Sequence, residues 1–268
     1  MYGVLSEVLD RLERNGAEKA GAIAWGCPVL SFGDPAASRV ATLGLNPSNR
    51  EFVDQDGKEL CGTQRRFHTL GSLNINSWRE TDARHLRVMI DSFHQYFTRN
   101  PYDRWFGKLD QVLMKAGASY YGTSQASQAC HLDVVPYATL SKWSLLTGAQ
   151  RRHLLRVSNS VLGILLRQSP IRVVVLNGRA VAELFEAVAQ VRLKRSEIPT
   201  WALPRRSGRD IMGVAFEGVV DVVAGVRLYR AVHVFGFNHN IQSSFGVTRQ
   251  VMMRIGDWIA SRIEQVGL

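Results

Sequence analysis

The stretch that decides the fold is RVATLGLNPS, residues 39 to 48. Its first seven residues are mostly apolar and include the β-branched Val40 and Thr42, a pattern that predicts a buried strand. The strand runs directly into Asn46-Pro47-Ser48, and Asn-Pro favours a turn. The sequence therefore predicts a sheet strand whose carboxyl end carries a polar loop.

Strands and helices alternate along the rest of the chain. We expect further strands at residues 131–135, 171–176, 214–223 and 226–237. Apolar residues at helical spacing predict helices at 4–12, 81–99, 103–116, 150–168, 180–191 and 246–265. Residues 49–76 and the basic segment 192–209 are expected to be loops. This alternation predicts one α/β domain over residues 1–268, a three-layer α/β/α sandwich around a mostly parallel sheet.

The composition is basic. The 268 residues carry 33 Lys plus Arg against 23 Asp plus Glu, and the net charge is +10. Of the 33 basic residues, 27 are Arg, whose planar guanidinium suits phosphate groups. This balance favours a polyanionic partner, with nucleic acid first, although an enzyme from an Arg-rich genome fits the composition equally well.

Several classes of protein are excluded. No apolar run approaches the roughly 18 residues of a membrane span. The three cysteines are Cys27, Cys61 and Cys130, without a C-x-x-C pair, which favours the cytoplasm and argues against a disulfide framework or an iron–sulfur cluster. Motifs for phosphate loops, dinucleotide sites, serine hydrolases and zinc proteases are missing. We expect no cofactor and no metal.

Polar residues follow three of the expected strands, at residues 44–48, 131–133 and 238–240. Ligands of parallel α/β sheets bind outside the carboxyl ends of the strands. These segments are therefore expected to converge on one site.

The segment Gly44-Leu45-Asn46-Pro47-Ser48 resembles the Gly-x-Asn-Pro loop of the uracil-DNA glycosylase superfamily, nearest its mismatch-specific and single-strand-selective branches. The order of elements also resembles that family, with a leading helix, this loop, strands near 131–136 and 173–178, and a late strand ending in a His-containing loop. The last loop departs from the family pattern, because Asn238-His239-Asn240 stands where His-Pro-Ser or Asn-Pro-Ser is usual.

The resemblance implies a monomeric, monofunctional enzyme that flips a nucleotide out of duplex DNA and hydrolyses its C1′–N bond. Asn46 would hold the attacking water, and His239 would donate a hydrogen bond to O2 of the departing base. Gly44 and Ser48 would contact the flipped DNA base. The alternatives are structural, with Asn46 as a turn residue and His239 as a loop histidine bonded within the protein.

Asp133 is a second departure from the family. In several branches an Asn at the matching strand end reads uracil, whereas a carboxylate can only accept hydrogen bonds. Cytosine offers an N4 amino donor that a carboxylate accepts well. If Asp133 lies in the pocket, the site prefers a cytosine-type base; the alternative is a strand-end Asp that caps a helix or pairs with an Arg.

Residues for stacking and DNA contact are also implied. Phe52 or Phe67 could stack on the flipped base, although core packing is the simpler interpretation of each. Phe245 stands where relatives insert a wedge, beside Ser243 and Ser244. The basic loop offers Arg205, Arg206 and Arg209 for phosphate contact.

The predicted function is excision of a 5-substituted cytosine, hydroxymethylated or glucosylated as in phage DNA. Some prokaryotic relatives are similar in kind and defend against phages in this way. Two alternatives stay open: a uracil or thymine mismatch glycosylase of base-excision repair, and a non-catalytic DNA-binding module with the same fold.

Overall fold

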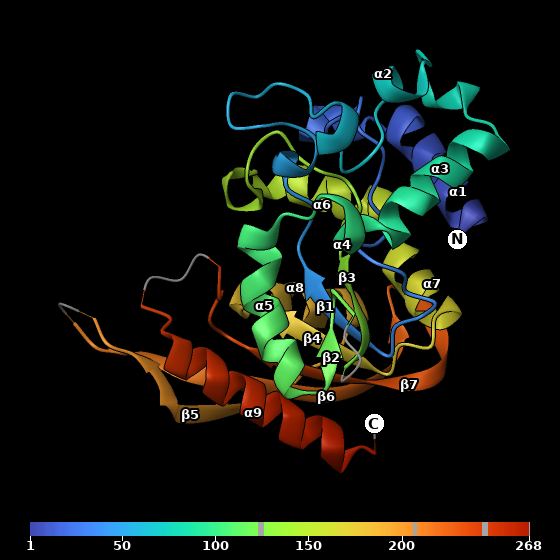
Figure 1. Cartoon of the computed structure of the whole chain (residues 1–268). Helices are drawn as coiled ribbons and strands as arrows, with labels where there is room; N and C mark the ends of the chain where they lie inside the picture. Colours follow the sequence, from blue (N-terminus) through green and yellow to red (C-terminus); the bar gives the residue numbers. More distant parts are fainter. Residues whose placement is uncertain (123–125, 206–207, 243–245, 268) are drawn as a thin grey trace.

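The computed structural model describes residues 1–122, 126–205, 208–242 and 246–267 (Figure 1). Within these ranges the centre is a seven-stranded sheet in the order β2-β3-β1-β4-β7-β6-β5. The strands are β1 Val40–Gly44, β2 Ala118–Ser119, β3 Ser127–Asp133, β4 Val173–Asn177, β5 Lys194–Leu203, β6 Ile211–Val223 and β7 Val226–Phe237.

The sheet is mostly parallel, as the sequence predicts. Strands β2, β3, β1, β4 and β7 pair in parallel, whereas β6 and β5 add an antiparallel extension beside β7. The β6–β7 turn consists of Ala224 and Gly225, which have φ angles of 51° and 73°. Two such left-handed residues are typical of the tightest hairpins, since they match the twist of the strands.

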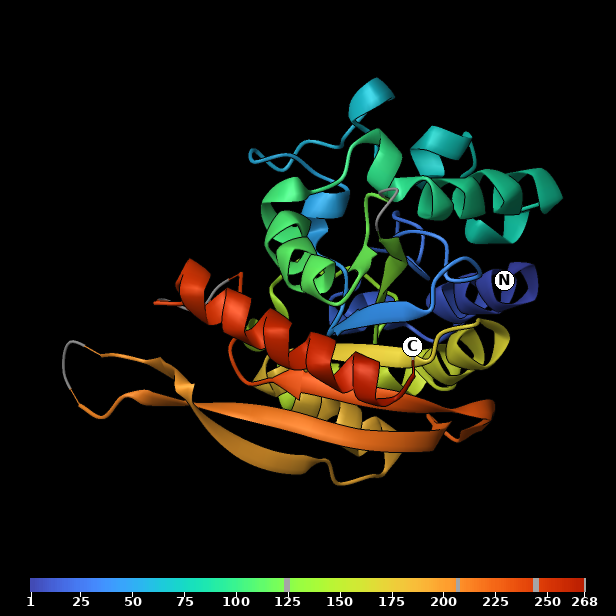
Figure 2. The same ribbon diagram turned by 60° about the horizontal axis from the view of Figure 1, so that its bottom comes forward.

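Helices cover both faces of this sheet (Figure 2). They are α1 Tyr2–Arg14, α2 Leu70–Leu73, α3 Ala83–His94, α4 Tyr96–Arg99, α5 Asp103–Lys115, α6 Gly148–Ser158, α7 Val161–Gln168, α8 Arg179–Ala189 and α9 Arg249–Gln265. Consecutive residues of a strand face opposite sides. In β6, Glu217 lies 3.5 Å from Arg262 of α9. The preceding Phe216 lies under Arg195, which pairs with Glu186 of α8 at 2.6 Å. The two helices therefore lie on opposite faces.

Four expectations about local structure are wrong. The segment 49–76, expected to be a loop, contains the short helix α2. The helix expected at 81–99 is divided at Gln95 into α3 and α4, and the helix expected at 150–168 is divided at Asn159, whose φ is 37°, into α6 and α7. The basic segment expected to be a loop contains β5, because its backbone pairs with β6. Pro199 is tolerated there because β5 is an edge strand.

The strand ends position the site. Strands β1, β3, β4 and β7 run in parallel, so their carboxyl ends lie at the same edge of the sheet. Gly44 and Asp133 are direct partners in the register of β1 and β3. The edge gathers the loops after all four strands. Among the helices that the structure describes, none is both long and apolar enough to cross a membrane.

Candidate functional site

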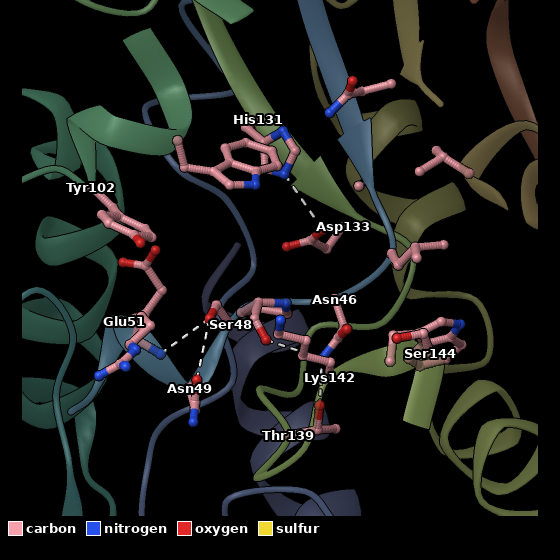
Figure 3. Close-up of a pocket in the computed structure, with 18 of the residues that line it drawn as sticks. Asn46, Ser48, Asn49, Glu51, Tyr102, His131, Asp133, Thr139, Lys142 and Ser144 are labelled. Carbon is pink, nitrogen blue, oxygen red and sulfur yellow. Dashed lines mark hydrogen bonds and ion pairs between the residues drawn. The ribbon is translucent and has the colours of Figure 1, made fainter. Parts of the chain in front are cut away.

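A cavity of about 790 Å³ opens at the carboxyl edge of the sheet (Figure 3). Its volume lies in the upper part of the range of about 300–1,000 Å³ that is usual for small-molecule sites. One wall is the loop 44–51, and another is the segment 139–145. Aromatic side chains form a third wall, namely Phe32, Tyr102, Trp105 and Phe106. Asn177 at the end of β4 and Asn240 in the loop after β7 also line the cavity.

Asp133 lines this cavity and is only 8% exposed. Its Oδ1 lies 3.4 Å from Nε2 of His131. The carboxyl lies over Gly44, where a Cβ atom would overlap Oδ1 and come within 2.9 Å of Nε2 of His131. The glycine thus provides the space that this carboxylate occupies.

His131 is held from its other side. Its Nδ1 lies 2.7 Å from the hydroxyl of Thr42, which is itself hydrogen-bonded to Tyr120. With Thr42 donating to Nδ1, the Nε2–H group faces Asp133. The sequence signal for this contact is the spacing His-x-Asp, because residues two apart on a strand have side chains on the same face. The sequence analysis placed the segment 131–133 at the site but gave His131 no role; in the structure it holds Asp133 in place.

Asn46 also lines the cavity, and its amide is fixed. Nδ2 donates to the carbonyl of Tyr137 at 3.2 Å, to Oγ1 of Thr139 at 3.0 Å and to the carbonyl of Pro47 at 3.0 Å. These bonds use the donor side of the amide and leave its oxygen as a hydrogen-bond acceptor. Ser48 supports the same loop, because its hydroxyl accepts from the backbone N–H of Arg50 at 3.2 Å.

Glu51 is the site residue that sequence reasoning missed. Its side chain lines the cavity although the residue is only 3% exposed. The hydroxyl of Tyr96 donates to Oε2 at 2.8 Å, and Nε of Arg66 lies 3.9 Å from the same oxygen. Burial raises the pKa of Glu51 to about 7, and the charge of Asp133 adds to this, against the lowering effects of Arg66 and Tyr96. A carboxyl group that titrates near neutrality can transfer protons.

The rim of the cavity carries exposed apolar side chains. Leu140 is 63% exposed and Leu145 is 73% exposed, and both line the opening. Lys142 lies between them in sequence and also lines the cavity. Exposed leucines beside a cavity are suited to contact with a partner.

His239 does not line the cavity, contrary to the sequence expectation. It is buried, and its Nε2–H donates to the carbonyl of Trp201 at 2.7 Å. Burial lowers the pKa of His239 below its ordinary value. The next residue, Asn240, lines the cavity in its place. His239 is thus the internally bonded loop histidine of the alternative interpretation.

Phe52 and Phe67 are core residues and not cavity residues. Their rings lie 6.0 Å apart, and Phe67 stacks on Tyr96 at 5.2 Å. They belong to an aromatic cluster that also contains Phe32. The stacking role expected for them is wrong, because the cluster, and not the cavity, surrounds both rings.

The residues expected to contact DNA lie elsewhere. Arg205 and Arg209 are exposed near the tip of the β5–β6 hairpin, which projects from the body (Figure 2). Neither lines the cavity. The remaining residues of this prediction lie outside the described residues: Arg206, Ser243, Ser244 and Phe245.

Over the described ranges, no group of three or more His, Cys, Asp and Glu side chains could hold a metal ion.

Comparison with known proteins adds no assignment, since no protein-family model matches the chain. No curated protein matches it in sequence.

Proposed function

We propose that this protein is a monofunctional DNA glycosylase that hydrolytically excises a modified pyrimidine, namely a 5-substituted cytosine, and leaves an abasic site. The observation that carries the proposal is that Asp133 and Asn46 line the same cavity. One side chain suits the recognition of a base, and the other suits the positioning of a water molecule.

Asp133 supports recognition of cytosine. An ionised carboxylate accepts a hydrogen bond from the N4 amino group of cytosine. The O4 atom of uracil or thymine would instead face the carboxylate oxygens, acceptor against acceptor. Gly44 leaves room for the carboxylate of Asp133, and the contact with His131 holds it in that place, so the carboxylate does not easily turn away from the wrong base.

Asn46 supports hydrolysis. Its free amide oxygen can accept one hydrogen of a water molecule and thereby direct the water oxygen toward C1′ of the sugar. An amide is not a strong base, but orientation alone is worth several kcal/mol when the base departs first. The electron pair of the C1′–N bond leaves with the base, and the water oxygen forms the new bond to C1′.

The aromatic wall supports binding of a flipped base. Tyr102, Trp105 and Phe106 present rings to the cavity, in the role first expected of Phe52 and Phe67. An extruded base is held by stacking and by hydrogen bonds to its edge. The cavity volume of about 790 Å³ suits a base with a large 5-substituent, such as a hydroxymethyl or glucosyl group.

The rim and the net charge support a DNA partner. The exposed Leu140 and Leu145 can enter the space that a flipped base leaves in the stack. Lys142 and the overall charge of +10 favour the phosphate backbone. The proposal includes the glycosylase-like three-layer fold, a monomeric cytoplasmic enzyme without a cofactor, and defence against phages with modified DNA.

The test is the release of abasic sites from three duplexes that contain uracil, 5-hydroxymethylcytosine or its glucosylated form. We expect cleavage of one or both cytosine-derived duplexes, and its loss in Asn46→Ala. Cleavage of the uracil duplex alone would indicate a repair enzyme. Tight binding without cleavage of any duplex would indicate a non-catalytic module.

A further inference from the structure

We propose that Glu51 is a second base-contacting carboxyl group, which donates a proton to the pyrimidine ring as the glycosidic bond breaks while Asp133 holds the exocyclic amino group. This inference rests on the proposed glycosylase function and adds a general acid, Glu51, to its mechanism. The sequence resemblance assigns no role to residue 51.

The geometry places both carboxyl groups at one cavity. Glu51 and Asp133 each line it, from the loop after β1 and from the end of β3. In Figure 3 the carboxyl group of Glu51 lies beside the ring of Tyr102, and that of Asp133 lies beside His131. Tyr96 and Arg66 approach Oε2 of Glu51, which leaves Oε1 as the oxygen for a ligand.

The two carboxyl groups have different surroundings. Asp133 faces a ring N–H of His131, a donor that suits a carboxylate. Glu51 is buried, the charges of Arg66 and Asp133 act on it, and the hydroxyl of Tyr96 donates a hydrogen bond to it. Burial outweighs the lowering effects of Arg66 and Tyr96, and the charge of Asp133 adds a smaller upward contribution, so the pKa of Glu51 rises to about 7 and near neutrality much of it carries a proton.

Such a pair complements the edge of cytosine. That edge offers a donor at N4 followed by acceptors at N3 and O2, so its partner must accept once and then donate. An ionised Asp133 accepts from N4, and a protonated Glu51 donates to N3 or O2. Uracil has an acceptor at O4 and a donor at N3–H. Its O4 would face the accepting Asp133, and its N3–H would face the donating Glu51.

The proton also serves the chemistry. When the C1′–N1 bond breaks, its electron pair stays on N1, and charge spreads over the ring to N3 and O2. Transfer of the Oε1 proton of Glu51 lets the base leave as a neutral molecule. Water adds its oxygen to C1′ and loses one proton to solvent, from which Glu51 is protonated again. This donor is needed because His239, expected to stabilise O2, is bonded to Trp201 instead.

The test compares wild-type protein with Glu51→Gln and Tyr96→Phe on a duplex that the wild type cleaves, over about pH 6 to 9. Gln fits the same space and can donate a hydrogen bond but cannot give up a proton. We expect wild-type excision to fall as the pH rises above about 7, because the acid is lost. Glu51→Gln should be at least about 100-fold slower and independent of pH. Duplex affinity and thermal unfolding identify any loss of binding or folding.

Tyr96→Phe removes a hydrogen bond that lowers the pKa of Glu51, so the alkaline limb should move to higher pH. A duplex with 5-formylcytosine, whose electron-withdrawing group makes the base a better leaving group, should partly restore Glu51→Gln. These readouts respond to a proton donor and not to a merely structural glutamate.

The outcomes separate the two proposals. A wild-type enzyme that cleaves the cytosine-derived duplex without an alkaline limb, and a Glu51→Gln variant of equal rate, would overturn the role of Glu51 and leave the glycosylase intact. If Glu51→Gln does not fold, the wild-type and Tyr96→Phe pH profiles still decide. Absence of any base release by the wild type would overturn both.

Discussion

A Cβ atom on Gly44 would overlap Oδ1 of Asp133, its partner across β1 and β3. The first atom of any side chain at residue 44 would therefore displace the carboxylate or the imidazole of His131 beside it. The identity of one residue on β1 thus determines where the carboxylate of the neighbouring strand β3 lies.

Replacement of Gly44 by Ala should lower excision by about 100-fold, because a displacement of about 1 Å at a reacting site has an effect of that size. The measurement is single-turnover base release. Gly107→Ala on α5 is the matched control, since nothing lies within 4 Å of a Cβ atom there. Equal rates for both variants would show that the position of Asp133 is unimportant.

Asp133→Asn should shift base preference toward uracil, because an amide can both donate to O4 and accept from N3–H. One base contact of this kind discriminates by about 1–3 kcal/mol, or roughly 5- to 150-fold. The measurement is the ratio of release rates from the uracil and cytosine-derived duplexes. An unchanged ratio would remove Asp133 from base recognition.

Leu145→Ala should reduce excision from duplex DNA on the order of tenfold, because the wedge helps to offset the unstacking of the target base. Excision from a single strand should change little, since no stack has to be opened. Val219→Ala on β6 removes another exposed apolar side chain, which lies away from the cavity, and serves as control. A matching loss on single strands would argue against a wedge.

Phe67→Leu should lower the free energy of unfolding by on the order of 2 kcal/mol, because it leaves a void among Phe52, Phe93 and Tyr96. Base preference of the folded protein should be unchanged. Urea unfolding measures the first effect and base release the second. Tyr229→Leu, at a side chain that is 78% exposed, should change the unfolding free energy by less than about 0.5 kcal/mol.

Glu51→Gln should gain stability relative to wild type as the pH rises. The folded state keeps the proton of Glu51 up to about pH 7, whereas the unfolded chain loses it near 4.5. Raising the pH through this window therefore lowers the unfolding free energy of the wild type, by at most about 3 kcal/mol. Urea unfolding at about pH 5 and pH 8 measures the difference. Glu197→Gln, at an exposed carboxyl on β5, is the control, and a constant difference for Glu51→Gln would contradict the raised pKa.

The sequence predicted the features that depend on local pattern. An apolar run followed by Asn-Pro located β1 and its loop, and the strand ends at Asp133 and residues 238–240 were also located. The prediction that these strand ends form one site needed only the rule that the carboxyl ends of parallel strands lie at one edge of the sheet. The mostly parallel sheet followed from the alternation of elements.

The features that depend on distant contacts could not be predicted. Nothing local distinguishes Glu51 from other acids in the polar stretch 49–76, because its burial comes from the folded structure and its hydrogen-bond partner Tyr96 is 45 residues away in sequence. Whether His239 or Asn240 faces the cavity depends on a difference of one residue at the end of β7. Strand β5 is extended because β6 provides its backbone partners, and not because of its own composition.

The pairing of Gly44 with Asp133 also links correct assembly to activity. A slip of one residue between β1 and β3 would turn Asp133 to the other face and bring Leu132 beside Gly44. A misregistered chain would thus lose the carboxylate of the cavity together with the packing of its strands. Under the proposed glycosylase function this is a safeguard: a misregistered molecule would be inert toward DNA and would not become less selective.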